Sequence, residues 1–151
     1  FIKEVVKEKK IHTLWFEAHY MYRKKLASFA EQFAPAKVKF RCGVETFDTA
    51  LREAWKKGIP SSVSVQDIAQ HFQGICLLCC TQGETKEHIL KDIELAKAHF
   101  EYFSVNVFCE NHTPMKQDKE LASWFAKEVY PMIKDDPRIE VLMENTDLGV
   151  G

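Results

Sequence analysis

The sequence predicts an α/β protein in which a parallel sheet curls into part of a TIM-type barrel. Three observations lead to this prediction. Five segments with the length and apolar character of strands alternate with stretches whose apolar residues recur at helical spacing. Alternation of strand and helix is typical of βαβ units with right-handed crossovers. Polar side chains line one face of most strands, which favours a hollow inner face over a flat sheet with helices on both sides.

Apolar patterns and a helix-ending proline define the first two predicted strands and the helix between them. Residues 1–8 have helical spacing, residues 11–18 are the first strand, and residues 37–44 are the second strand. The helix between the strands ends before Pro35, and its apolar face is formed by Tyr22, Leu26, Phe29 and Phe33.

The middle of the chain contains two expected helices and the third strand. A helix over residues 47–57 ends at Gly58 with Pro60 just beyond, and Ser64 caps a shorter helix that continues to Phe72. The apolar run at residues 74–80 is the third strand.

The last third repeats the same alternation. Residues 84–100 and 118–133 carry apolar residues on one helical face, and they bracket a fourth strand at residues 102–109. Residues 138–144 are the fifth strand.

The polar rows distinguish the inner face of the barrel from its outer face. Successive side chains of a strand point to opposite faces, so polar residues at every second position share one face. These rows are Thr13, Glu17 and His19; Lys39, Arg41, Gly43 and Glu45; Ser104 and Asn106; and Glu140 and Glu144. Five strands cannot close a barrel of eight, so residues 1–151 are predicted to be one domain, the C-terminal portion of a barrel whose N-terminal strands are missing.

Composition narrows the function classes. The formal net charge of −1 gives no basic footprint for nucleic acid, and no apolar run is long enough to cross a bilayer. The five cysteines are an odd count and three of them lie in one strand, which argues against a disulfide framework. A cytoplasmic location follows as an expectation, with no membrane partner.

The cysteines of the third strand allow two interpretations. Cys76 and Cys79 have C-x-x-C spacing, but two thiolates converge on one metal ion when the spacer is a turn. In a strand these two side chains face opposite sides. Packing of Cys76, Cys79 and Cys80 as small buried side chains is therefore favoured, and no metal ligand is assigned.

Residues at the ends of parallel strands are the candidates for ligand binding. Glu45 could accept hydrogen bonds from a sugar diol, or it could cap the next helix. Glu84 and Thr85 also have a sound interpretation as a helix start. Arg41 should face inward and needs a carboxylate partner, which Glu17 or Glu45 could supply.

The order of these pieces resembles the later half of the radical S-adenosylmethionine barrel. In that family a strand ending in Gly-Val/Ile-Glu/Gln-Ser/Thr precedes a helix with a Lys/Arg-Gly end. The next strand ends in a Pro-Gly-Glu-Thr type turn, in which Gln82 here replaces the usual proline, and the strand after it runs to a loop that contains Thr-Pro. The matching pieces are residues 43–46, Lys57-Gly58, residues 82–85 and Thr113-Pro114, and the likeness covers residues 11 to about 145.

The resemblance implies S-adenosylmethionine as a cofactor, with Glu45 at its ribose and Glu17 facing the same molecule. The turn after the third strand would lie against the adenine and methionine end. The cofactor-binding residues predicted in this way are Glu17, Arg41, Glu45, Gln82, Gly83, Glu84 and Asn106.

One feature of the family is absent. The C-x-x-x-C-x-x-C motif that binds a [4Fe-4S] cluster does not occur in this sequence. The resemblance therefore implies reductive cleavage to a 5′-deoxyadenosyl radical and hydrogen abstraction by the complete protein, whereas this chain alone should be inactive. The substrate, a small molecule or a peptide, cannot be identified.

Two alternatives remain open at this point. The chain could be a half-barrel that binds a partner without catalysis, or a metal-independent barrel lyase. The latter is disfavoured because no lysine is expected at the end of a strand inside the barrel. In either case an uncovered sheet edge could allow self-association.

Overall fold

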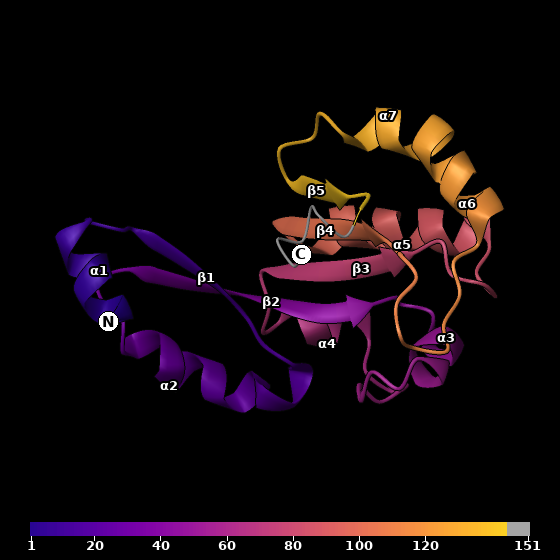
Figure 1. Ribbon diagram of the computed structural model, residues 1–151. Coiled ribbons are helices and arrows are strands. Elements are labelled where there is room, and N and C mark those ends of the chain that lie inside the picture. Colours follow the sequence, from indigo (N-terminus) through magenta and orange to yellow (C-terminus); the bar gives the residue numbers. More distant parts are fainter. Residues whose placement is uncertain (145–151) are drawn as a thin grey trace.

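The computed structural model describes residues 1–144 and has a single sheet of five parallel strands. The strands are β1 (Thr13–Glu17), β2 (Lys37–Glu45), β3 (Gly74–Cys79), β4 (Tyr102–Val107) and β5 (Ile139–Leu142). They are ordered β1-β2-β3-β4-β5, so each strand pairs with the one that precedes it in the chain (Figure 1). This order is that of a TIM-type barrel, in which every crossover places the next strand beside the last.

Helices occupy the connections between strands. The chain begins with α1 (Ile2–Glu8), and the first crossover contains the 3-10 helix η1 (Tyr20–Lys25) and α2 (Leu26–Glu31). The second crossover contains α3 (Thr49–Ala54) and α4 (Val65–Ala69), and the third is α5 (Lys86–His99). The last crossover is one helical segment formed by α6 (Lys119–Trp124), the π-helical turn η2 (Phe125–Val129) and α7 (Tyr130–Ile133).

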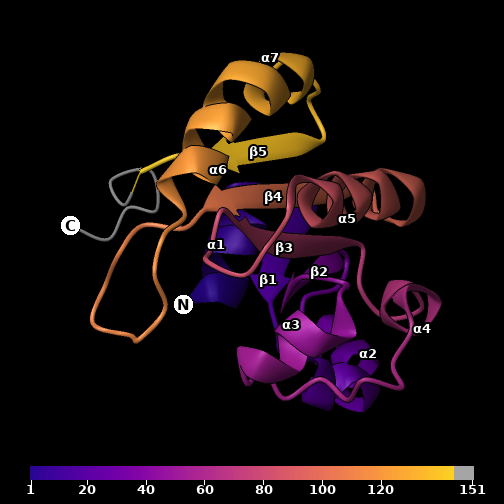
Figure 2. The same cartoon turned by 90° about the vertical axis from the view of Figure 1, so that its right-hand side faces the viewer.

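The helices of the crossovers gather on one side of the sheet. Figure 2 shows α2, α4, α5 and α7 arranged around the outer side of a curved row of strands. Five parallel strands curled in this way form a partial TIM-type barrel, which confirms the predicted fold class.

The core lies between the sheet and these helices. Alternate residues of β2, β3 and β4 are buried there, and Cys42, Val44, Ile75, Phe103 and Val105 are fully excluded from solvent. The facing helices contribute Leu26, Ile68, Ile89, Ile93, Ala96, Leu121, Phe125 and Val129.

The other set of strand side chains forms the concave face, and the register shows which of them are neighbours. Glu17 is level with Arg41, Arg41 with Gly74, and Gly74 with Tyr102. Further along the strands, Leu78 is level with Asn106. The polar rows expected from sequence therefore lie side by side on the inner face.

A bulge shifts the register of β2 against β3 between Gly43 and Glu45. Glu45 has a φ of 68°, a left-handed conformation that is uncommon for a residue with a side chain. Such a bulge redirects a side chain at the end of a strand, and here it affects the glutamate at the mouth of the concave face.

Candidate functional site

The candidate site is a polar hollow that runs along the concave face at the carboxyl ends of the strands. A cavity of about 740 Å³ is lined by Glu17, Ala18, His19, Gly43, Glu45, Trp55, Lys56, Lys57 and Gly58. A second cavity of about 310 Å³ shares Glu45 and Lys57 with the first and reaches Leu78, Asn106 and Leu142. The shared residues show that the two cavities adjoin.

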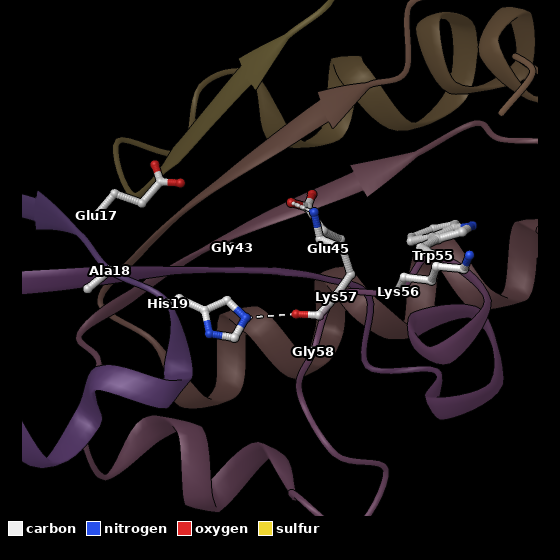
Figure 3. A pocket seen from close by; sticks show the side chains of 9 residues that line it. All are labelled: Glu17, Ala18, His19, Gly43, Glu45, Trp55, Lys56, Lys57 and Gly58. Atoms are coloured by element: carbon white, nitrogen blue, oxygen red, sulfur yellow. Dashed lines mark hydrogen bonds and ion pairs between the residues drawn. The ribbon is translucent and has the colours of Figure 1, made fainter. Parts of the chain in front are cut away.

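Glu45 and Lys57 form an ion pair where the two cavities meet. Oε1 of Glu45 lies 2.8 Å from Nζ of Lys57, and the two side chains are 15% and 33% exposed. Figure 3 shows the lysine reaching back to the glutamate at the end of β2. A short charge-assisted contact of this kind holds the carboxylate in one position while its second oxygen is not used by the lysine.

His19 fixes the segment that carries the lysine. Nε2 of His19 lies 2.7 Å from the carbonyl oxygen of Lys57, and Nδ1 accepts a hydrogen bond from the backbone N–H of Met21. The first contact therefore requires the Nε2–H tautomer, which donates to the carbonyl. Gly58 follows with a φ of 67°, and a Cβ there would lie 3.6 Å from the imidazole ring (Figure 3).

Gly43 leaves open space between two carboxylates. A Cβ at this position would lie 3.4 Å from Oε1 of Glu45 and 3.8 Å from Oε1 of Glu17. Both distances are ordinary contacts, so the backbone does not demand glycine for steric reasons at this point. The missing side chain instead gives a ligand close access to the strand between the two acids.

Asn106 presents an unused hydrogen-bond acceptor to the smaller cavity. Its Oδ1 atom is buried and has no partner in the described part of the chain. Buried amide oxygens are nearly always paired, so an unpaired one that lines a cavity points to a ligand or a water molecule there. The position on β4, level with Leu78 of β3, places it on the concave face.

The loop after β4 forms one wall of the smaller cavity. Asn111, Thr113 and Met115 line it from this loop. The loop is held at its two ends, because Gln117 Nε2 donates to the carbonyl of Phe108 at 2.6 Å and the N–H of Asp118 donates to that of Cys80 at 2.8 Å. Of the Thr-Pro pair noted in the sequence, Thr113 lines this wall.

The turn of Gln82, Gly83 and Glu84 lies at the same end of the sheet but lines neither cavity. The Glu84 carboxylate accepts hydrogen bonds from the N–H and hydroxyl of Thr81, at 2.7 and 2.9 Å. Burial raises the pKa of Glu84 to about 7. These contacts make Glu84 a support of the turn, and the predicted role of the three residues in cofactor binding stays a prediction.

Arg41 lies deeper on the concave face than Glu45. Its guanidinium is 3.5 Å from Oε2 of Glu17 and 3.6 Å from Oε2 of Glu140. Glu17 is thus the partner expected for this inward arginine, whereas Glu45 pairs with Lys57 instead. Glu140, on the far edge strand β5, reaches Arg41 across the concave face and was not among the expected partners.

The cysteines of β3 pack as the strand alternation requires. Cys76 faces the concave side beside Ser104, and Cys79 faces the helices, where its sulfur lies 3.7 Å from that of Cys80. Burial raises the pKa of Cys76 to about 11 and that of Cys79 well above its ordinary value. Within residues 1–144 no group of three His, Cys, Asp or Glu side chains could hold a metal ion.

Two site residues were not selected from the sequence. Lys57 was noted only as the Lys-Gly end of a helix, and His19 only as a member of the polar row of the first strand. Both reach the site by tertiary contacts across 12 and 38 residues of chain, as the Glu45 ion pair and the His19 hydrogen bond show. No periodicity in the sequence signals such contacts.

Comparisons with known proteins identify a structural neighbour. A queuine lyase from Clostridium spiroforme, solved bound to SAM and queuine, superposes with a TM-score of 0.91 at 35% sequence identity. The match covers 99% of this chain and 64% of the lyase chain. The resemblance to the radical S-adenosylmethionine superfamily is thereby confirmed. No protein-family model and no curated protein matches the sequence.

This chain therefore spans less than two thirds of the length of the lyase chain. None of the helices in the described part of the chain is both long and apolar enough for a membrane span.

Proposed function

We propose that the concave face binds S-adenosylmethionine as part of a radical S-adenosylmethionine enzyme. The observation that carries the proposal is the close superposition on a protein solved with SAM bound, over nearly the whole of this chain. A purely structural half-barrel would not need a polar hollow at the ends of its strands. The reaction and substrate of the full-length protein are part of the same proposal.

The residues of the hollow fit the chemistry of this cofactor. A ribose diol donates two hydrogen bonds, and the Glu45 carboxylate, fixed by Lys57, can accept them. The unpaired oxygen of Asn106 can accept from an amino group. The sulfonium and ammonium charges of the cofactor are matched by Glu17 and Glu45, which flank the open backbone at Gly43.

Within the proposed function, this chain positions the cofactor and does not activate it. When bound, S-adenosylmethionine supplies a 5′-deoxyadenosyl group for hydrogen abstraction. The sequence has no C-x-x-x-C-x-x-C motif, and Cys42, Cys76, Cys79 and Cys80 are buried, so its cysteines do not suit an iron–sulfur cluster. A cluster would have to be held by another part of the full-length protein.

The substrate we propose is a queuine-like base, because the structural neighbour is bound to queuine. Queuine carries the amide and amidine edge of guanine, which offers ring and amino N–H donors beside a carbonyl acceptor. The five free cysteines agree with a reducing cytoplasm as the compartment.

The proposal is tested with the full-length protein, purified and reconstituted with iron and sulfide without oxygen. Incubation with dithionite, S-adenosylmethionine and queuine should yield 5′-deoxyadenosine, measured by mass spectrometry, together with loss of queuine. A protein that contains iron and binds S-adenosylmethionine but yields no 5′-deoxyadenosine would contradict the enzymatic function and favour a binding module.

A further inference from the structure

The concave face contains a third cavity below the proposed cofactor site. It has a volume of about 250 Å³ and is lined by Trp15, Phe16, Glu17, Arg41 and Tyr102. Glu17 also lines the cavity of about 740 Å³, so the two adjoin. Of the other four residues, Arg41 alone was predicted from the sequence to bind the cofactor.

Two aromatic rings form the floor of this cavity. Trp15 and Tyr102 lie with their ring centroids 5.8 Å apart, and Trp15 keeps 42% of its surface exposed. Glycine at position 74 makes this arrangement possible. A Cβ on Gly74 would lie 3.1 Å from Cζ3 of Trp15 and 2.8 Å from the carbonyl oxygen of Tyr102. Any other residue would push the indole away from the sheet.

The charged groups beside the rings are loosely paired. The distances from Arg41 to Glu17 and Glu140 are 3.5 and 3.6 Å, whereas charge-assisted hydrogen bonds measure about 2.7–2.9 Å. The hydroxyl of Tyr102 donates a hydrogen bond to Glu140 at 2.9 Å. Burial raises the pKa of Tyr102 to about 12. Glu17 is 58% exposed and has no other acceptor role in the described chain. Its carboxylate therefore has lone pairs available to a ligand.

We infer that this cavity binds a planar guanine-type base, with Trp15 against its ring and with Glu17 and Arg41 at its polar edge. The inference rests on the proposed function and places the substrate of that function. A carboxylate can accept both the ring N–H and the amino N–H of such an edge, and a guanidinium can donate to the adjacent carbonyl. Stacking of a base on an aromatic side chain supplies affinity for any base, whereas the edge contacts supply specificity.

Size and position agree with this assignment. Pockets for drug-sized ligands measure about 300–1,000 Å³, so a cavity of about 250 Å³ suits a single heterocycle. Arg41 precedes Glu45 by four residues along β2, which corresponds to roughly 13 Å at about 3.3 Å per residue. A cofactor at Glu45 and a base at Arg41 would thus occupy adjoining levels of the same hollow.

The test is isothermal titration of queuine and 7-deazaguanine into the full-length protein, without reductant or S-adenosylmethionine. Trp15→Ala should weaken the binding of both bases at least tenfold, whereas the matched variant Trp124→Ala, on α6, should not. An equal affinity of wild type and Trp15→Ala would overturn the inference, as would failure of the wild type to bind either base.

The edge contacts are tested with 7-deazahypoxanthine, which lacks the amino group. The wild type should prefer 7-deazaguanine at least tenfold, and Glu17→Gln should abolish the preference without changing the melting temperature, because the side chain is more than half exposed. A preference that survives in Glu17→Gln would contradict the role of this carboxylate.

These outcomes are separable from failure of the proposed function. Base binding that depends on Trp15 in a protein that does not bind S-adenosylmethionine would keep the inference and reject the cofactor. Cofactor binding and 5′-deoxyadenosine formation, with base binding unaffected by Trp15→Ala, would keep the proposed function and reject the base site.

Discussion

Glu45 and Lys57 meet at 2.8 Å across the mouth of the concave face, the first from the bulged end of β2 and the second from the segment after α3. The bulge gives Glu45 its left-handed backbone, and His19 holds the carbonyl of Lys57. The pair is partly buried, and its most important consequence for the site is the fixed position of the Glu45 carboxylate.

Replacement of Glu45 tests its predicted contact with the ribose. Glu45→Gln keeps the shape of the side chain but removes the charge, and one of its two terminal atoms becomes a donor. We expect the dissociation constant for S-adenosylmethionine to rise at least tenfold in the full-length protein, measured by equilibrium dialysis. Glu94→Gln, on the exposed side of α5, is the matched control and should leave the constant unchanged. Equal affinities for Glu45→Gln and wild type would remove Glu45 from the site.

Replacement of Asn106 should weaken cofactor binding without lowering the stability of the fold. Asn106→Leu replaces a buried, unpaired amide oxygen with a group of similar size. An unsatisfied buried polar group costs about 1–3 kcal/mol, so the free energy of unfolding should stay equal or rise. Affinity for S-adenosylmethionine should fall at least fivefold. Destabilisation with unchanged affinity would show that the amide serves the fold instead.

Gly43→Ala should reduce cofactor affinity without harming the fold. The added methyl group would meet Glu45 and Glu17 at normal contact distances, so the melting temperature should change by no more than about 2 °C. The same methyl group would occupy the approach to the strand that we assign to the cofactor. If the variant binds S-adenosylmethionine as tightly as wild type, the ligand does not lie over Gly43.

The raised pKa of Glu84 predicts a pH-dependent effect of Glu84→Gln. The ordinary value is 4.5 and burial raises it to about 7. The folded state therefore favours the protonated acid, and the associated stabilisation is present below pH 4.5 and is lost as the pH rises through 7. A shift of this size corresponds to about 3 kcal/mol.

Urea unfolding at pH 5 and pH 8 measures this effect. Glu84→Gln resembles the protonated acid, so its free energy of unfolding relative to wild type should be higher at pH 8 than at pH 5, by about 2 kcal/mol. Asp92, whose pKa is also raised, to about 6, is present in both proteins, and its negative charge contributes to the raised pKa of Glu84. A difference that does not vary with pH would show that Glu84 is ionised throughout.

The cysteines of β3 are predicted not to bind a metal ion. Cys76→Ala with Cys79→Val in the full-length protein should leave the iron content unchanged, measured by elemental analysis. The double variant should lose about 1–2 kcal/mol of stability because both side chains are buried. Loss of iron from the purified protein would reverse the interpretation of these residues as packing.

The fold was largely predictable because strand and helix periodicities are local. The five predicted strands all occur, within a few residues of their expected ends. The expected helix start at Ser64 also occurs, as the start of α4, where Ser64 forms a capping box with Asp67. The predicted helix over 47–57 is shorter, Thr49–Ala54, because Asp48 caps its start and the backbone of Lys56 turns left-handed.

The site was only partly predictable because its contacts are not local. Alternation along β2 placed Arg41 and Glu45 on the inner face. It could not show that Glu45 would pair with Lys57 rather than with Arg41, since the bulge that turns Glu45 toward the mouth leaves no trace in the residue pattern. Gly74 likewise gave no signal, because its role is to admit the ring of Trp15 from a strand two positions away.

A crystal structure of the full-length protein with S-adenosylmethionine tests the central claim most directly. We expect ribose oxygens about 3 Å from the Glu45 carboxylate and a polar group of the ligand within hydrogen-bond distance of Asn106 Oδ1. Electron density for the ligand on the outer, helical side of the sheet, or a Glu45 still paired only with Lys57, would contradict it.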